Sequence, residues 1–585
     1  MVERAPRGGA CSRTSGEREY GQYNPSPRRR TDGCDPHPSQ ASHLTSRGGH
    51  DRVGDDPTGR LGHNVAVSSP QRPSPGNARR RAARARLPLR PTAWRAPLPL
   101  RVVRAARRPG RAEPDDTPGA RPARDRSGGP AALLERLGVR NRLERAARFS
   151  PARLAVAVFA AIIAVITILL LLPIATPEDH RGASLVDALF TATSAVCVTG
   201  LTTVDTATAW SPFGQAVIIA GAAVGGLGIM TLASLLSFAV SRHVGLTQRM
   251  LAASENQSRL GDVASLLRAV IFTALGVEGV LALVLLPRFL TLGLDLRHAA
   301  WYAVFMSASI FNNAGFVIMP EGLAPHAADW WMCLPIVLGT FAGAVGFPVI
   351  LDVVRRRGRP RLWTLHSKLT LTTYTLLALV SSLSIAAFEW SNPQTYGPLG
   401  VGGKVLTALV NGVNARSSGL STIQPEHMHE ATWFLQDALM FVGGGSASTA
   451  GGIKVTTFAV LILAIMAEAR GDQDIEAFGR RITLSTVRLS VAVAFIGASI
   501  IGAATLLLLQ LTDLSLDRIL FEATSAFATV GLSTGITPHL PESGKYVIIV
   551  LMFVGRVGTM TAASALAMRE RRRVIRMPAE RPLIG

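Results

Sequence analysis

Four short segments of the sequence each place one glycine between a short apolar run and a long apolar run. They are Val198-Thr199-Gly200-Leu201, Asn313-Ala314-Gly315-Phe316, Ser417-Ser418-Gly419-Leu420 and Thr529-Val530-Gly531-Leu532. The glycines are spaced roughly 104 to 115 residues apart, an internal repeat much longer than the unit of a solenoid. Four similar turns held by hydrophobic segments predict one ion path lined by four stretches of backbone.

The chemistry of ion permeation explains why such turns would contain glycine. A cation that crosses a bilayer loses its water shell, and backbone carbonyl oxygens can replace that shell without adding a full charge. Glycine permits the backbone angles that this needs and leaves no side chain in the path. The alternative interpretation is that each glycine is a helix breaker or a packing contact, since glycine is common in membrane helices. Because four glycines occur in equivalent surroundings, the sequence favours the interpretation that they line an ion-selectivity filter.

The apolar runs that follow the basic N-terminal region predict the membrane topology. Eight runs are long enough to cross about 30 Å of hydrocarbon: 152–172, 213–240, 264–290, 330–354, 364–389, 434–467, 484–511 and 545–568. Four runs of roughly 12 to 15 residues are too short to span and are predicted as re-entrant pore helices: 184–197, 298–312, 402–415 and 517–528. The predicted fold is an all-α membrane protein of four M1–P-loop–M2 repeats around a central pore.

The same pattern predicts the domain boundaries and the orientation. The repeats occupy residues 149–250, 251–360, 361–475 and 476–570, followed by a basic C-terminal segment, 571–585. The connections between repeats are basic, as in Arg355-Arg356-Arg357 and Arg480-Arg481, whereas the opposite loops carry few Lys or Arg. The positive-inside rule therefore places both termini in the cytoplasm and turns the glycine segments outward in a multi-pass protein of the plasma membrane.

The first 148 residues differ in composition from the rest of the chain. The net charge is +22, and about half of the Lys and Arg precede residue 150. This region is rich in Arg, Pro and Gly and lacks periodicity, so it is predicted to be disordered. It is interpreted as a solvated arm with weak attraction for anionic membrane lipid, or as a mis-assigned start with the true start near Val139. Nucleic-acid binding is disfavoured because the Arg runs lack interleaved aromatic residues.

The residues around the four turns resemble the pore loops of the Ktr/Trk/HKT potassium transporter superfamily, and most of all the bacterial KtrB-type membrane subunit. The resemblance rests on the segments 190–201, 312–316, 416–419 and 521–532 and covers about residues 150–570. It implies potassium uptake across the bacterial plasma membrane, with K⁺ held by backbone carbonyls of the twelve filter residues: Val198, Thr199, Gly200, Asn313, Ala314, Gly315, Ser417, Ser418, Gly419, Thr529, Val530 and Gly531. The third turn departs mildly from the pattern of this superfamily, because Ser417-Ser418 stands where Thr-Ala is more usual.

A glycine-rich segment, 443–454, interrupts the sixth predicted span. Five glycines and three hydroxyl residues do not support a continuous helix, because each interior glycine costs about 1 kcal/mol relative to alanine. One interpretation is a packing kink. The resemblance implies instead an intramembrane gating loop below the filter, controlled by a cytosolic partner, with these candidate residues: Gly443, Gly444, Gly445, Ser446, Gly451, Gly452 and Lys454.

Two arginines within the apolar region are further candidates. Arg556 lies inside the last predicted span, where a buried cation is costly and is by default a functional hypothesis. The resemblance places it in the pore below the filter, where its charge would raise the barrier for cations; the alternative is an ion pair with Glu522 or Glu278. Arg416, directly before the third turn, is expected to hydrogen-bond loop carbonyls and so support the filter shape.

The sequence predicts a transporter with no bound cofactor and no enzymatic activity. No Walker-type loop or G-x-G-x-x-G motif is visible, so nucleotide control would have to come from another protein. The resemblance implies a homodimer docked on a cytoplasmic RCK-type nucleotide-binding regulatory subunit, and it leaves Na⁺ stimulation of K⁺ transport open. The alternative function is a coupled secondary transporter of another small solute.

Overall fold

The computed structural model describes residues 151–177, 182–242, 263–558, 578 and 580. All of them belong to one compact unit, Ala120–Gly585. The predicted disordered tail, 1–148, and nearly all of the basic segment 571–585 lie outside the described residues. These two predictions therefore stay predictions.

The described part of the chain is predominantly helical. Its longer α-helices are α3 (Pro151–Leu170), α6 (Pro212–Arg242), α8 (Val263–Thr291), α9 (Leu296–Asn312), α10 (Trp330–Val345), α12 (Leu365–Glu389), α15 (Val455–Arg470) and α16 (Leu484–Leu511). The shorter ones are α4 (Leu185–Cys197), α5 (Thr206–Ala209), α11 (Phe347–Arg355), α13 (Val401–Asn414), α14 (Glu430–Phe441), α17 (Leu516–Ala528) and α18 (Glu542–Phe553). Five 3₁₀ turns are η1 (Pro173–Ala175), η2 (Ala324–His326), η3 (Pro360–Leu362), η4 (Pro425–His427) and η5 (Thr537–His539), and a π-helical turn, η6 (Val554–Gly558), follows α18.

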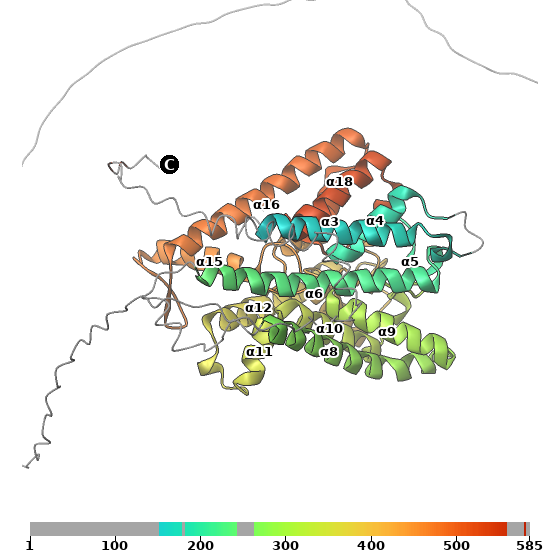
Figure 1. Cartoon of the computed structure of the whole chain (residues 1–585), viewed down its shortest axis with the longest axis horizontal. Coiled ribbons are helices and arrows are strands. Elements are labelled where there is room, and N and C mark those ends of the chain that lie inside the picture. The colour runs from blue at the N-terminus through green and yellow to red at the C-terminus, as the bar shows by residue number, and fades with distance from the viewer. Residues whose placement is uncertain (1–150, 178–181, 243–262, 559–577, 579, 581–585) are drawn as a thin grey trace, which may run out of the picture. The chain divides into compact units, whose positions relative to one another are not determined.

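The four segments predicted as short pore helices are helices α4, α9, α13 and α17, within about two residues of the expected bounds. Each packs against several other helices of the bundle: α4 against α3 and α6, α9 against α8, α6 and α10, α13 against α12 and α10, and α17 against α16, α14 and α18. Figure 1 shows α6 running between α3 on one side and α8 and α9 on the other. Each predicted pore helix is therefore held by at least two neighbouring helices.

The long helices include clear candidates for membrane spans. By length and apolar composition, three helical segments within the described residues qualify: Leu267–Thr291, Leu365–Glu389 and Leu484–Leu511. A fourth qualifies if α10 and α11 are taken as one bent span. The apolar parts of α3 and α6 are shorter, Ala155–Leu170 and Pro212–Gly228. The total of eight spans expected from the sequence therefore stays a prediction.

The structure corrects the expected continuous span 330–354. This span breaks into α10 and α11, which meet at an angle of 96°. Gly346 joins the two helices with a φ of 92°, a backbone angle that favours glycine. A break at this position is not predictable from the sequence, because a single glycine is common in membrane helices.

A small β-hairpin is a second departure from the expected all-α fold. Strands β1 (Ile475–Ala477) and β2 (Arg480–Ile482) pair antiparallel in the connection between α15 and α16. Phe478 and Gly479 form the two-residue turn, with φ values of 51° and 71°. Positive φ at both positions matches the twist of a hairpin, so this turn closes tightly despite the bulky phenylalanine.

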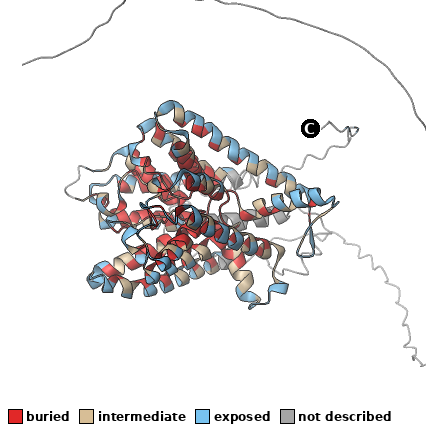
Figure 2. Ribbon diagram, turned by 180° about the vertical axis from the view of Figure 1, so that it is seen from behind, coloured by how far each residue is buried: buried red, intermediate tan, exposed pale blue. Residues whose placement is uncertain are grey.

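Burial is concentrated where the helices meet. Figure 2 shows the buried residues gathered in the interior of the bundle and the exposed ones along the outer sides of the long helices. Many of those outer residues are large and apolar, such as Phe272 on α8, Leu383 on α12 and Phe495 on α16. Exposed apolar side chains in such number are unusual for a protein in water and are typical of helices that face lipid.

Close helix contacts depend on glycine at particular positions. Gly225 on α6 lies directly against the backbone of Val196 on α4, so that an added Cβ atom would collide with the Val196 carbonyl. This contact sets how near α6 comes to the short helix before the first glycine turn. Gly276 on α8, by contrast, has no atom within 4 Å of an added Cβ.

These two glycines give a test of the packing. We expect Gly225→Ala to destabilise the protein by about 1–3 kcal/mol, because an extra methyl group forces the helices apart. Gly276→Ala, the matched control, should leave the melting temperature of the detergent-purified protein unchanged or slightly raised. Equal melting temperatures for the two variants would contradict the close contact between α4 and α6.

Candidate ion-conduction site

The four glycine turns lie together in the structure. Each glycine approaches the neighbouring turn so closely that an added Cβ atom would collide with the backbone there: Gly200 with Ala314 and Gly315, Gly315 with Ser418, Gly419 with Val530 and Gly531, and Gly531 with Thr199 and Gly200. These contacts pass from the first turn to the second, third and fourth and return to the first. The four turns therefore form a closed ring. All four glycines have positive φ, between 64° and 98°.

Three of the short helices end in the same unusual backbone conformation. The residue after α4, α9 and α17 is left-handed, with φ values of 57° at Val198, 58° at Asn313 and 49° at Thr529. Asn tolerates this conformation, but β-branched residues such as Val and Thr are outliers in it, at a cost of roughly 1–2 kcal/mol. Strained backbone of this kind persists only where the surrounding structure enforces it, and it clusters at functional sites.

Serine side chains fix the turns from within the short helices. The Ser194 Oγ accepts a hydrogen bond of 3.0 Å from the Gly200 N–H, and the Ser525 Oγ accepts one of 3.1 Å from the Gly531 N–H. Ser309 differs in detail, because its Oγ donates to the Phe316 carbonyl at 2.7 Å. The sequence reasoning missed these residues. A serine six positions before the glycine, in three of the four turns, was the available signal.

The third turn is built differently. Helix α13 ends at Asn414, the next residue, Ala415, is in right-handed conformation, and the residue six positions before Gly419 is Val413. The Asn414 carbonyl accepts the N–H groups of Ser417, Ser418 and Gly419 at 3.1, 3.2 and 3.4 Å. The departure that the sequence indicated at Ser417-Ser418 therefore extends to the backbone path into this turn.

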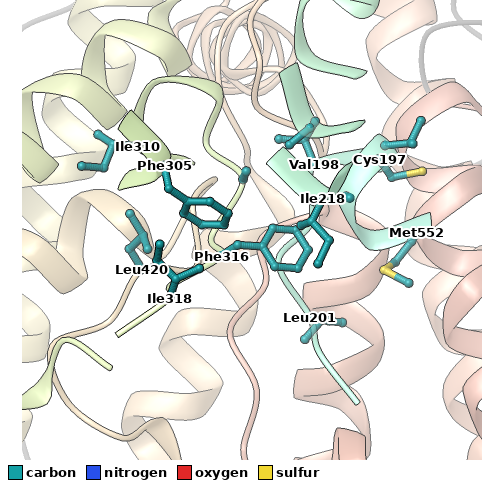
Figure 3. Packing of buried hydrophobic residues seen from close by; sticks show 14 of the residues in the cluster. Cys197, Val198, Leu201, Ile218, Phe305, Ile310, Phe316, Ile318, Leu420 and Met552 are labelled. Atoms are coloured by element: carbon teal, nitrogen blue, oxygen red, sulfur yellow. The ribbon is translucent and has the colours of Figure 1, made fainter. Parts of the chain in front are cut away.

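Apolar side chains surround the ring. Figure 3 shows Phe316 of the second turn beside Phe305 of α9, with Leu201 of the first turn and Leu420 of the third turn in the same cluster. On one side two cavities open onto the turns, one of about 270 Å³ at Gly419 and Gly531 and one of about 260 Å³ at Gly200 and Gly531. The backbone of the ring is thus packed in protein around it and reachable through cavities.

The glycine-rich segment 443–454 connects α14 to α15 as a loop, and it lies on the broken end of α10. The Gly445 N–H donates to the Ala344 carbonyl at 2.8 Å, and the Thr449 N–H donates to the Gly343 carbonyl at 3.4 Å. The last carbonyls of a helix have no partner within that helix. The loop therefore supplies donors that the break at Gly346 requires.

The other predicted loop residues lie within this arrangement. Gly443 and Gly451 face each other across the loop, and an added Cβ on Gly451 would also collide with Thr529 of the fourth turn. The Lys454 Nζ donates to the Ala450 carbonyl at 2.7 Å, and the Ser446 Oγ lies 3.2 Å from the Thr456 Oγ1. Gly444 packs against Ala344, and Gly452 has a φ of 64°. The loop thus contacts both α10 and the ring.

Arg556 lies in η6, is 2% exposed, and reaches the same loop. Its Nη1 donates to the Thr449 carbonyl. Within the described residues it forms no ion pair with either carboxylate that the sequence offered as an alternative. Glu278 accepts instead from the Asn312 Nδ2 at 2.7 Å, and Glu522 accepts from the Thr537 hydroxyl.

Arg416 is fully buried and does not act as expected. Its three guanidinium nitrogens have no hydrogen-bond partner in the described part of the chain, so the expected bonds to loop carbonyls are absent there. The guanidinium stacks on the ring of Tyr374 in α12 instead, with the Cζ atom 3.7 Å from the ring centroid. A desolvated cation–π contact of this kind is worth about 2 kcal/mol.

Helical packing of apolar segments around a ring of backbone turns defines a polytopic membrane protein with a carbonyl-rich centre. The TrkH family model, described as cation transport protein, matches residues 145–573. The chain belongs to this family of cation transport proteins.

Curated relatives are similar over nearly their whole length. Ktr system potassium uptake protein B of Bacillus subtilis (strain 168) is 36% identical over 424 residues, which are 72% of this chain and 94% of the relative. Potassium/sodium uptake protein NtpJ of Enterococcus hirae is 33% identical over 439 residues, 73% of this chain and 94% of the relative. The crystal structure of the potassium transporter TrkH from Vibrio parahaemolyticus has the same fold, with a TM-score of 0.57, 17% identity and coverage of 70% of this chain and 83% of that one.

The stacking of Arg416 can be tested with two substitutions of its partner. Tyr374→Phe keeps the ring and removes a hydroxyl that has no partner among the described residues, so it should change stability little. Tyr374→Leu removes the ring and leaves a buried guanidinium without it, which should cost about 2 kcal/mol or more. Thermal unfolding of the purified protein measures both. A Tyr374→Phe variant as unstable as Tyr374→Leu would show that the hydroxyl, and not the stack, matters.

Proposed function

We propose that this protein takes up K⁺ across the cell membrane through the ring of four glycine turns, as four M1–P-loop–M2 repeats around one pore. The observation that carries the proposal is the closed ring in which each glycine adjoins the next turn's backbone. Relatives named potassium uptake proteins support K⁺ as the ion. The twelve residues of the turns then present their carbonyl oxygens to the dehydrated ion.

The short helices add to this effect. The C-terminal ends of α4, α9, α13 and α17 adjoin the turns, and the end of a helix carries partial negative charge that favours a cation. The membrane potential drives the ion inward with about 2.3 kcal/mol per charge per 100 mV. Arg556 and the glycine-rich loop form the gate, because a cationic side chain bound to the loop opposes the passage of K⁺ as long as the two stay in contact.

The assembly follows the names of the relatives. A Ktr system potassium uptake protein B is by its name one part of a system, which supports a separate subunit that works with this membrane protein. In this proposal the separate subunit is a cytoplasmic RCK-type regulatory protein, and this chain forms a homodimer. Both termini lie in the cytoplasm in this proposal. The relative named potassium/sodium uptake protein supports testing Na⁺ for stimulation of transport. The second candidate function is a coupled secondary transporter of another small solute.

The ring is tested by substituting its glycines. Gly200→Ser and Gly315→Ser add a side chain where φ is 91° and 76° and where the next turn's backbone is in contact. A strain of roughly 1–2 kcal/mol that falls on the K⁺-bound ring and not on the Na⁺-bound ring lowers the preference for K⁺ over Na⁺ by about 5- to 30-fold, and we expect a loss up to this size. Complementation of a K⁺-uptake-deficient bacterium at low external K⁺, together with ⁸⁶Rb⁺ uptake in competition with K⁺ or Na⁺, measures this loss.

The control for these variants is Gly502→Ser on α16. Gly502 is exposed on its helix and has no atom within 4 Å of an added Cβ, so the same substitution should leave uptake and ion preference as in the parent. Parent-like ion preference in both ring variants would contradict the proposed ion path. A parent protein that transports another solute but no K⁺ would favour the second candidate function.

A further inference from the structure

The side chain of Asn313 joins three parts of the site. Its Nδ2 donates to the Thr449 Oγ1 of the glycine-rich loop at 2.6 Å, and its Oδ1 accepts from the Ser417 Oγ of the third turn at 3.1 Å. Asn313 itself belongs to the second turn. One amide group therefore links the second turn, the third turn and the loop.

This link is buried and closely enclosed. Asn313, Ser417 and Thr449 are each 0% exposed. An added Cβ on Gly343 of α10 would lie 2.6 Å from the Asn313 Nδ2 and 3.0 Å from the Thr449 Oγ1, so α10 closes the link from one side. A buried amide that loses its partner is costly, because no water replaces the lost hydrogen bond.

Backbone conformation alone does not explain an asparagine at this position. Val198 and Thr529 occupy the equivalent left-handed positions of the first and fourth turns. The Val198 side chain has no polar group, and the Thr529 hydroxyl has no hydrogen-bond partner among the described residues. The side-chain link to the loop is thus made from the second turn, next to the point where α10 breaks and the loop is seated.

Thr449 is the member of the link that belongs to the glycine-rich loop, so it moves whenever the loop moves. Its hydroxyl accepts from Asn313, while its carbonyl accepts from Arg556 and its N–H donates to the Gly343 carbonyl. A loop that moves away from α10 breaks the contacts of Thr449 with the Gly343 carbonyl and with Asn313. The Asn313 Nδ2 then keeps only its 3.4 Å hydrogen bond to the Phe311 carbonyl, and the contact of Asn313 with Ser417 is no longer held in place from the loop side.

We propose that Asn313 is a positioning residue that couples the glycine-rich loop to the second and third turns, so that ion discrimination by the ring depends on where the loop lies. The inference rests on the proposed function and deepens it. With the loop in contact, the amide holds the two turns in one geometry. With the loop withdrawn, the same turns are less restrained and discriminate less well between K⁺ and Na⁺.

The first test removes the hydroxyl of Thr449. Thr449→Val keeps the shape of the side chain, and Thr449→Ser retains the hydroxyl. In ⁸⁶Rb⁺ uptake, Thr449→Val should lower the preference for K⁺ over Na⁺ by roughly 2- to 12-fold, the range of one hydrogen bond between uncharged groups, and Thr449→Ser should restore it. Thr340→Val on α10 is the matched control, because Thr340 is a fully buried threonine whose hydroxyl has no partner in the described residues.

The second test asks whether the effect passes through Asn313. Asn313→Gly keeps the left-handed backbone and removes the amide. If the amide carries the coupling, adding Thr449→Val to Asn313→Gly should produce no further change in ion preference, whereas independent effects would multiply. The melting temperatures of the same four proteins report the contact itself without any need for transport.

The outcomes separate this inference from the proposed function. A parent protein that transports K⁺, with Thr449→Val equal to the parent in ion preference, overturns the coupling and leaves the proposed function standing. Coupled melting temperatures without a change in ion preference make the link a structural contact only and also overturn the inference. A parent protein that transports no K⁺ removes the proposed function and this inference with it.

Discussion

The structure of this protein depends on the hydrogen-bond partners of backbone N–H and carbonyl groups that lie outside helices. Bare N–H and carbonyl groups are costly away from water, so non-helical segments persist at membrane depth only when protein or a water-filled cavity receives them. Here the four glycine turns adjoin one another in a ring, and the glycine-rich loop donates to the carbonyls at the end of α10. The carbonyl groups at the end of α10 thus accept hydrogen bonds from the loop that separates α14 from α15.

This constraint connects the glycine-rich loop to the ring. The loop reaches Arg556 through the Thr449 carbonyl and the second turn through the Thr449 hydroxyl. While these contacts hold, Thr449 joins the loop to both Arg556 and the second turn. Two further features accompany this arrangement. The buried Arg416 has no hydrogen-bond partner among the described residues and stacks on the ring of Tyr374, and the backbone of Val198 and Thr529 is left-handed. Such strain is tolerated where surrounding packing fixes the backbone.

Much of the helical pattern was predictable from local signals. Apolar runs located the four short helices because their length and flanking turns are written in adjacent residues. The hairpin at Phe478 and the bend at Gly346 were not, since a single glycine or a short polar connection permits several structures. Arg416 was placed correctly beside the third turn, but its partner Tyr374 lies on another helix, about forty residues earlier.

The sequence by itself determined that four glycines recur in equivalent surroundings and that an apolar chain is interrupted by a flexible loop, because composition and spacing are local properties. The tertiary structure alone decided that the turns close into a ring, that α10 bends at Gly346 and that the Asn313 amide bridges Thr449 and Ser417. Those partners lie 136 and 104 residues away along the chain. Hydrogen bonds act over about 3 Å, so only folding could show which distant groups meet.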